Sequence, residues 1–141
     1  MDDHGPLQRF VEAQDPVWNE VLAELRAGAK RTHWMWFVFP QIAGLGHSPM
    51  ARRYAISSEL EATSYLRHPI LGTRLRTCTQ LVLAVEGRSA TQIFGTPDDL
   101  KLHSSMTLFA LAAGDEADDL FRRVIDKYFA GALDAATRER L

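Results

Sequence analysis

The chain has 141 residues, of which 46% are hydrophobic, and it carries a formal net charge of −2. Because a chain of this length usually builds one hydrophobic core, the sequence predicts a single domain over residues 1–141. The slightly acidic charge excludes a general nucleic-acid binder, which would need a strongly basic face to hold phosphate groups. The single cysteine, Cys78, excludes an internal disulfide bond.

The N-terminal stretch MDDHGPLQRF has neither the basic start nor the apolar stretch of a signal peptide. No apolar run approaches the roughly 20 residues that cross a bilayer. We therefore expect a cytoplasmic protein without membrane contact.

In chain order, the apolar periodicity predicts helices over 16–28, 50–56, 60–66, 70–87, 97–114 and 120–131, with a final turn capped by Asp134. Asp15, Ser48 and Thr96 each stand before a proline, which is the arrangement of an N-cap followed by a first helical position. Ser58 and Glu61 have the spacing of a capping box. The helix over 70–87 is the expected central helix.

The segment 34–39 fits either a helix or a strand, because it is rich in aromatic and branched residues. No alternating apolar pattern competes with the helices elsewhere. The predicted fold class is therefore mainly α, a single compact domain of several short to medium helices.

The same segment supplies the first candidate ligand residues. His33, Trp34, Trp36 and Gln41 lie close together in the sequence, among two phenylalanines. Tryptophan rings bury a large area but keep an N–H that needs a partner, so two of them beside polar groups can form a wall on which a ligand stacks. A hydrophobic core strip is the alternative interpretation of these residues.

A glycine loop follows at once, in which Gly44 and Gly46 lead into the helix start at Ser48. Free backbone N–H groups in such an arrangement can hold an anion, although the third glycine of a dinucleotide fingerprint is absent. Residues 30–76 carry seven basic and two acidic side chains, Arg52 among the basic ones. This local charge favours a small anionic ligand, while solvated arginines and a plain helix cap explain the same pattern.

Lys101 and Ser105 share one face of the helix predicted after Thr96 and complete the candidate set. Ser104 shares this face and stands three residues after Lys101, which reverses the S-x-x-K order, so nucleophilic catalysis is not expected. The histidines lack the spacing of a helical zinc site, and we expect neither a metal nor a cofactor. The acidic cluster within 115–119 is typical of a solvated helix start.

Four stretches of the chain together resemble the bacterial domain-of-unknown-function 1810 family, in the same order and over nearly the whole length. They are KRTHWMWFVFPQIAGLGHSP, EATSYLRHPILGTRL, IFGTPDDLKLHSSMTLF and DKYFAGALDAATRERL. The resemblance implies a small, mainly helical fold and no established activity. The family is sometimes labelled calpastatin-like, but such an inhibitor is a disordered repeat protein, unlike a chain with helix caps and apolar faces.

A weaker similarity links the chain to the YbiA-like proteins of ADP-ribose and riboflavin-intermediate metabolism. It implies that Trp34 or Trp36 stacks on a ring and that Arg52 or Arg53, together with the glycine loop, holds phosphate. It also implies that Glu61 or Lys101 polarises a glycosidic carbon.

The resulting hypothesis is a small anionic, nucleotide-like ligand, related to ADP-ribose, in an aromatic-lined pocket. Its residues are His33, Trp34, Trp36, Gln41, Gly44, Gly46, Ser48, Arg52, Lys101 and Ser105. The alternative is a non-catalytic module whose exposed aromatic rings dock a protein partner. Convergence of His33, Gln41, Lys101 and Ser105 on one concave surface would favour the ligand site. The sequence leaves open whether the protein is an enzyme.

Overall fold

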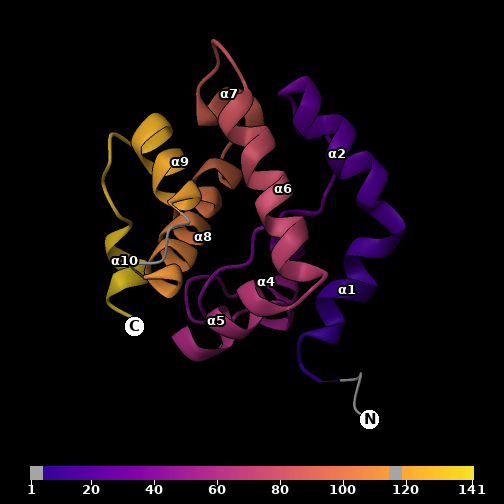
Figure 1. Cartoon of the computed structure of the whole chain (residues 1–141), viewed down its shortest axis with the longest axis vertical. Coiled ribbons are helices and arrows are strands. Elements are labelled where there is room, and N and C mark those ends of the chain that lie inside the picture. The colour runs from indigo at the N-terminus through magenta and orange to yellow at the C-terminus, as the bar shows by residue number, and fades with distance from the viewer. Residues whose placement is uncertain (1–4, 115–118) are drawn as a thin grey trace.

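The computed structural model describes residues 5–114 and 119–141 and consists of helices joined by short loops (Figure 1). They are α1 (Gln8–Gln14), the 3-10 turn η1 (Asp15–Val17), α2 (Trp18–Ala27), α3 (Met35–Val38), α4 (Pro49–Arg53), α5 (Glu59–Arg67), α6 (Leu71–Ala84), α7 (Ala90–Phe94), α8 (Asp98–Ala113), α9 (Leu120–Phe129) and α10 (Ala135–Arg138). Within the described residues, the β-structure is limited to an isolated parallel bridge between Ile42 and Ile56. The predicted fold class, mainly α, is confirmed. None of the described helices has the length and apolar character needed to cross a bilayer.

Several helix ends lie where the sequence predicts them. Gly28 ends α2 in the left-handed conformation, with φ of 67°. The Ser48 hydroxyl accepts a hydrogen bond from the Ala51 amide at 3.1 Å at the start of α4. Asp134 caps α10 in the same way through the amide of Thr137. These ends are predictable because a cap depends on residues only a few positions apart.

The N-terminal helices differ from the prediction. Residues 8–14 form α1, whose first turn has no capping side chain. Asp15–Val17 then continue the chain through η1 into α2 instead of starting a new helix. The ambiguous segment 34–39 contains the short helix α3.

Two further differences lie around α8. Ser89 and Gln92 form a complete capping box at α7, a helix that the apolar periodicity does not indicate. Thr96 does not cap α8; its hydroxyl donates to the Asp99 carboxylate at 3.3 Å. Of the acidic cluster, residues 115–118 lie outside the described part of the chain.

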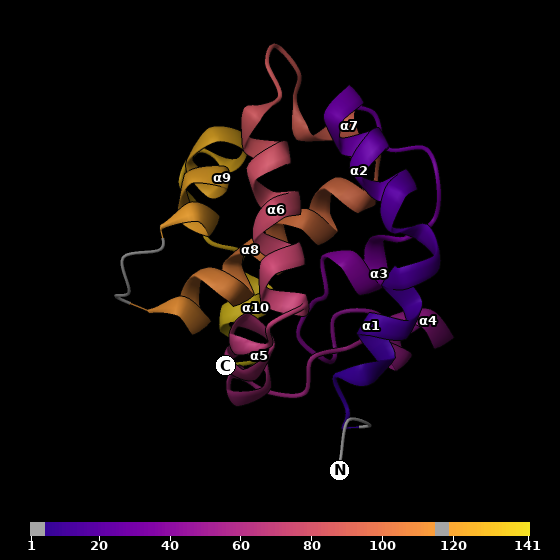
Figure 2. The ribbon, with the colours of Figure 1, turned by 45° about the vertical axis from the view of Figure 1, so that its right-hand side comes forward.

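Helix α8 is more enclosed than α6, because ten of its 16 residues are buried, against six of 14 in α6. All but one of its residues from Leu102 to Ala110 are buried. It packs against α5, α7, α9 and α10, and it crosses the middle of the molecule behind α6 in the view of Figure 2. Because α8 is apolar on nearly all sides, its periodicity does not reveal which of its polar residues reach the surface.

Candidate functional site

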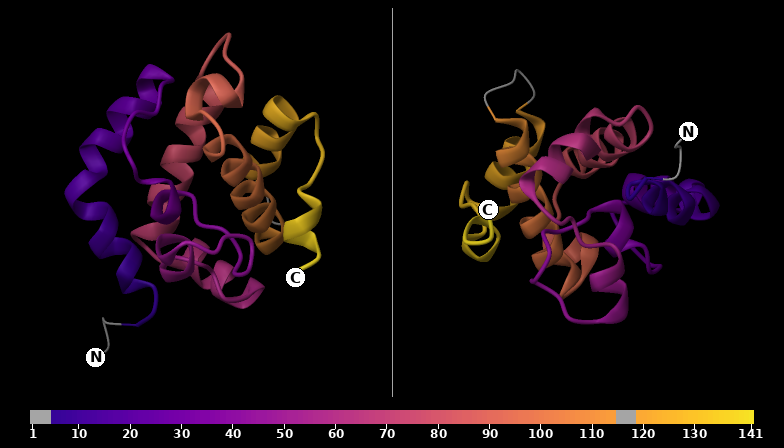
Figure 3. Two further views of the ribbon diagram at one scale, coloured as in Figure 1. Left: turned by 180° about the vertical axis from the view of Figure 1, so that it is seen from behind. Right: turned by 90° about the horizontal axis from the view of Figure 1, so that it is seen from below.

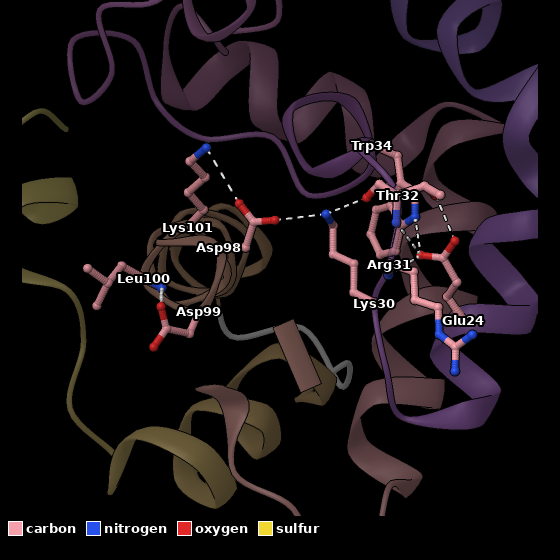
Figure 4. Close-up of polar contacts among 9 residues, drawn as sticks. All are labelled: Glu24, Lys30, Arg31, Thr32, Trp34, Asp98, Asp99, Leu100 and Lys101. Carbon is pink, nitrogen blue, oxygen red and sulfur yellow. Dashed lines mark hydrogen bonds and ion pairs between the residues drawn. The ribbon is translucent and has the colours of Figure 1, made fainter. Parts of the chain in front are cut away.

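Glu24, near the end of α2, anchors the start of the aromatic segment (Figure 4). Its carboxylate accepts hydrogen bonds from the amides of Arg31 (2.7 Å) and Thr32 (3.1 Å), the Thr32 hydroxyl (2.7 Å) and the indole Nε1 of Trp34 (3.0 Å). Burial by itself would raise the pKa of Glu24, but these hydrogen bonds favour the charged form and lower the pKa to about 2. An ionised carboxylate therefore holds this turn.

Most of the aromatic rings in segment 34–39 belong to the core. Trp34, Phe37 and Phe39 are each at most 7% exposed, whereas Trp36 is half-buried at the edge of the core. The Trp34 N–H has its partner in Glu24. The core-strip interpretation thus describes three of the four rings.

A chain of charges joins this segment to α8 (Figure 4). Lys30 Nζ lies 2.8 Å from Asp98 Oδ2 and 4.9 Å from the centroid of the Trp34 ring. On the other side, Lys101 Nζ lies 3.6 Å from Asp98 Oδ1 and 5.2 Å from the centroid of the Trp36 ring. Each of these two tryptophans therefore carries a lysine from the same charge chain over its ring.

A pocket of about 440 Å³ opens beside this chain of charges. Its walls are the glycine loop, the first two turns of α8 and the start of α10, which lies beside α8 when the molecule is seen from behind (Figure 3). A volume of this size is typical of small-molecule sites. The lining residues are Gln41, Leu45, Gly46, His47, Ser48, Ala51, Pro97, Leu100, Lys101, His103, Ser104, Asp134 and Ala136.

Four of the predicted site residues meet in this pocket, namely Gln41, Gly46, Ser48 and Lys101. A much smaller hollow of about 10 Å³ adjoins it and is lined by Trp36 and Gly44, together with Gln41 and Gly46. Gly44 has φ of 98°, which L side chains rarely adopt, and the end of the Arg140 side chain lies over it.

The remaining predicted residues lie outside the pocket lining. His33 and Arg52 are exposed, and Trp34 is in the core. Ser105 is fully buried on α8, and its hydroxyl has no hydrogen-bond partner among the described residues. Of the four residues whose convergence would favour a ligand site, the pocket brings together Gln41 and Lys101.

A family model described as "Protein of unknown function (DUF1810)" matches residues 4–141. The chain belongs to this DUF1810 family. Its structure is similar to the crystal structure of the conserved hypothetical protein Rv1873 from Mycobacterium tuberculosis, with a TM-score of 0.93 and 58% sequence identity over 96% of this chain and 95% of that chain. No functionally curated protein matches this DUF1810 chain. The family resemblance predicted from the sequence is confirmed.

The pocket of this DUF1810 protein also contains residues that are not among the ten predicted ligand residues. Asp134 is predicted only as a helix cap, and His103 and Ser104 precede the selected Ser105 on α8. Which residues of α8 face the pocket depends on the rotation of a helix that is buried on nearly all sides. Within residues 5–114 and 119–141, no group of three or more His, Cys, Asp or Glu side chains could hold a metal ion.

The first turn of α4, which follows the glycine loop of the DUF1810 pocket, offers few free backbone amides. Pro49 has no N–H, the Ala51 amide donates to the Ser48 hydroxyl, and the Arg52 amide donates to the Ser48 carbonyl at 3.0 Å. The feature of the pocket that suits an anion is therefore the side chain of Lys101 rather than a helix start.

A larger pocket of about 600 Å³ lies between the start of α1 and α5. None of the ten predicted ligand residues lines it, although Glu61, which the YbiA-like similarity implies as a polarising group, does. Its described lining includes no lysine or arginine. In this pocket, Oε1 of Glu61 accepts a hydrogen bond from the Ser57 amide at 2.8 Å and lies 3.8 Å from Nη2 of Arg9. Despite its size, this second pocket of the DUF1810 protein is less suited to an anion than the one beside Lys101.

Proposed function

We propose that this protein binds a small anionic, nucleotide-like ligand, related to ADP-ribose, in the pocket between the glycine loop and α8. The observation that carries the proposal is the meeting of Lys101 with Gln41, Gly46 and Ser48 around one volume of about 440 Å³. The lysine supplies a cation for a phosphate group, and the Gln41 amide can both donate and accept hydrogen bonds. The Ser48 hydroxyl accepts from the Ala51 amide, which leaves its own O–H free to donate.

Lys101 has hydrogen-bonding capacity to spare. Its Nζ lies 3.6 Å from Asp98 Oδ1, longer than the roughly 2.7–2.9 Å of a charge-assisted hydrogen bond. The other oxygen of Asp98 is already paired with Lys30 at 2.8 Å. The Trp36 ring beside the ammonium supports the lysine side chain, so we assign Trp36 to positioning Lys101 rather than to stacking on the ligand.

Two leucines add apolar surface to the same pocket. Leu45 and Leu100 both line it, and Leu100 is 60% exposed. A cation beside exposed apolar surface fits a ligand with one charged part and one flat apolar part, and a nucleotide has both. The alternative hypothesis, a module with exposed aromatic anchors, has no comparable support, because three rings of the aromatic segment are buried.

Calorimetric titration with ADP-ribose tests the proposal. The wild type is expected to bind, and Lys101→Ala is expected to bind at least about tenfold more weakly, because a hydrogen bond to a charged group contributes about 1.5–3 kcal/mol. Arg52→Ala should have a smaller effect, since Arg52 is exposed and lies outside the pocket lining. Arg26→Ala is the matched control, because Arg26 is an exposed arginine on α2.

Added salt should also weaken binding to the wild type, because it screens the attraction between Lys101 and the phosphate groups. The proposal is wrong if ADP-ribose produces neither heat nor a change in melting temperature with the wild type. Equal affinities for the wild type and Lys101→Ala would remove the lysine from the site.

A further inference from the structure

Asp134 is the acidic side chain in the lining of the proposed ligand pocket, and its carboxylate is held in one orientation. Oδ2 accepts hydrogen bonds from the Thr137 amide (3.1 Å) and the Thr137 hydroxyl (2.6 Å). The Ser104 hydroxyl also lies 3.2 Å from Oδ2, and its single proton is shared with the Leu100 carbonyl oxygen at the same distance. The backbone amide of Asp134 donates to the Thr107 hydroxyl at 2.9 Å. Both the side chain and the backbone of Asp134 are therefore tied to α8 and α10.

The segment before Asp134 is tied to α8 by a second contact. His103 Nε2 lies 2.6 Å from the Ala132 carbonyl oxygen, and because a carbonyl only accepts, this nitrogen carries the proton. The His103 ring stacks on Phe129, with centroids 4.2 Å apart and an angle of 7° between the planes. His103 thus acts as a positioning residue for the wall that carries Asp134.

One carboxylate oxygen of Asp134 is left over. The hydrogen-bond contacts of the carboxylate all go to Oδ2, and Oδ1 accepts none from any residue in the described part of the chain. Capping α10 needs a single oxygen, so the cap does not use Oδ1. A fixed carboxylate oxygen in a pocket wall is a ready acceptor for a donor on the ligand, because its orientation needs no further ordering.

The charges of the pocket determine which part of a ligand can reach this oxygen. A phosphate group is repelled by Asp134 and attracted by Lys101, so the anionic end of the ligand lies beside Lys101. The part of the ligand beside Asp134 must then carry hydrogen-bond donors. Hydroxyl groups of a ribose are such donors, and an acidic side chain accepts them in dinucleotide-binding sites.

We infer that Asp134 determines the ligand class of this pocket by accepting hydrogen bonds from sugar hydroxyls, so that the pocket selects a ribosyl phosphate over a bare phosphate or pyrophosphate. The inference rests on the proposed function and adds a second recognised group to it. Lys101 binds the anionic end, and Asp134 binds the sugar.

Two probes, ADP-ribose and inorganic pyrophosphate, test this assignment on Asp134→Asn and Asp134→Ser. Both replacements are good helix N-caps, so α10 keeps its cap while the charge is lost. ADP-ribose should bind at least about tenfold more weakly to either variant, because a charged acceptor has been removed. Pyrophosphate should bind as tightly as to the wild type or more tightly, because a repulsive charge has gone.

Lys101→Ala is the comparison variant and should weaken the binding of both ADP-ribose and pyrophosphate. Unchanged ADP-ribose binding in both Asp134 variants, with weakened binding in Lys101→Ala, would overturn the role of Asp134 and leave the proposed function standing. Equal weakening of ADP-ribose and pyrophosphate in the Asp134 variants would also overturn it, since it would indicate a structural role. Absence of ADP-ribose binding to the wild type would overturn the inference together with the proposed function.

Discussion

The carboxylate of Glu24 accepts four hydrogen bonds from residues 31–34, and this one side chain directs the path of the chain from α2 into the aromatic segment. His33 lies in the same turn, yet it is exposed, and its side chain makes no hydrogen bond, ion pair or ring contact within the described residues. Glu24 is thus the polar residue that stabilises this turn, although His33 is the one that the sequence pattern draws attention to.

Replacing Glu24 should therefore lower the free energy of unfolding more than replacing His33 does. Glu24→Gln removes the charge from an acceptor of four donors, and we expect the free energy of unfolding to fall by about 1–3 kcal/mol. His33→Ala is the matched control in the same turn, and its effect should stay within about 0.5 kcal/mol. Urea denaturation near neutral pH measures both. A larger loss in His33→Ala than in Glu24→Gln would contradict this account.

The stabilisation by Glu24 should also depend on pH, in a direction that its pKa fixes. The pKa in the folded protein, about 2, lies below the value of 4.5 for a free glutamate. The stabilisation is therefore complete above the unfolded-state pKa and is lost as the pH falls toward the folded-state pKa. The difference in stability between the wild type and Glu24→Gln should narrow as the pH falls below about 4.5 in the same denaturation experiment.

At the scale of helices, the helix ends that the sequence predicts are those that depend on residues close together in the chain. Gly28, Ser48 and Asp134 end or begin helices as predicted, because each acts on backbone groups a few residues away. Helix α1 has no capping side chain and gives no such signal. The pocket depends on the placement of α10 beside the glycine loop and α8, which local periodicity cannot predict.

The contact between α5 and α6 provides a test of packing against helix propensity. Gly72 lies in the first turn of α6, where a Cβ would stand only 2.1 Å from the carbonyl oxygen of Leu66. Propensity alone would make Gly72→Ala stabilising by about 1 kcal/mol. The close approach of the two backbones reverses the sign of this effect. We expect Gly72→Ala to lower the free energy of unfolding by about 1–3 kcal/mol, as at other overpacked sites.

Gln80→Ala is the matched control on the same helix, because Gln80 is exposed. Its effect on the free energy of unfolding should stay within about 0.5 kcal/mol. Guanidinium denaturation followed by circular dichroism measures both variants. A Gly72→Ala variant at least as stable as the wild type would show that the two helices can move apart at no cost.

For the whole molecule, a line of aromatic rings connects helices that are distant in sequence. The Phe10 ring of α1 lies 5.2 Å from the Tyr65 ring of α5, which lies 5.3 Å from Phe109 of α8, and this in turn lies 6.0 Å from Phe121 of α9. All four side chains are fully buried and belong to one hydrophobic cluster. The described N-terminal and C-terminal helices thus share a core, and the single domain over residues 1–141 stays a prediction.

This shared core should make the protein unfold in one cooperative transition. The chain allows a sharp test, because its three tryptophans, Trp18, Trp34 and Trp36, all lie in the first part of the sequence. Their fluorescence reports on the N-terminal region, whereas far-UV circular dichroism reports on all helices, including α8, α9 and α10. We expect the two denaturation curves to have the same midpoint and slope, since loss of the Tyr65–Phe109 contact opens the core on both sides. Separate midpoints would mean that the C-terminal helices unfold on their own and would contradict a single domain.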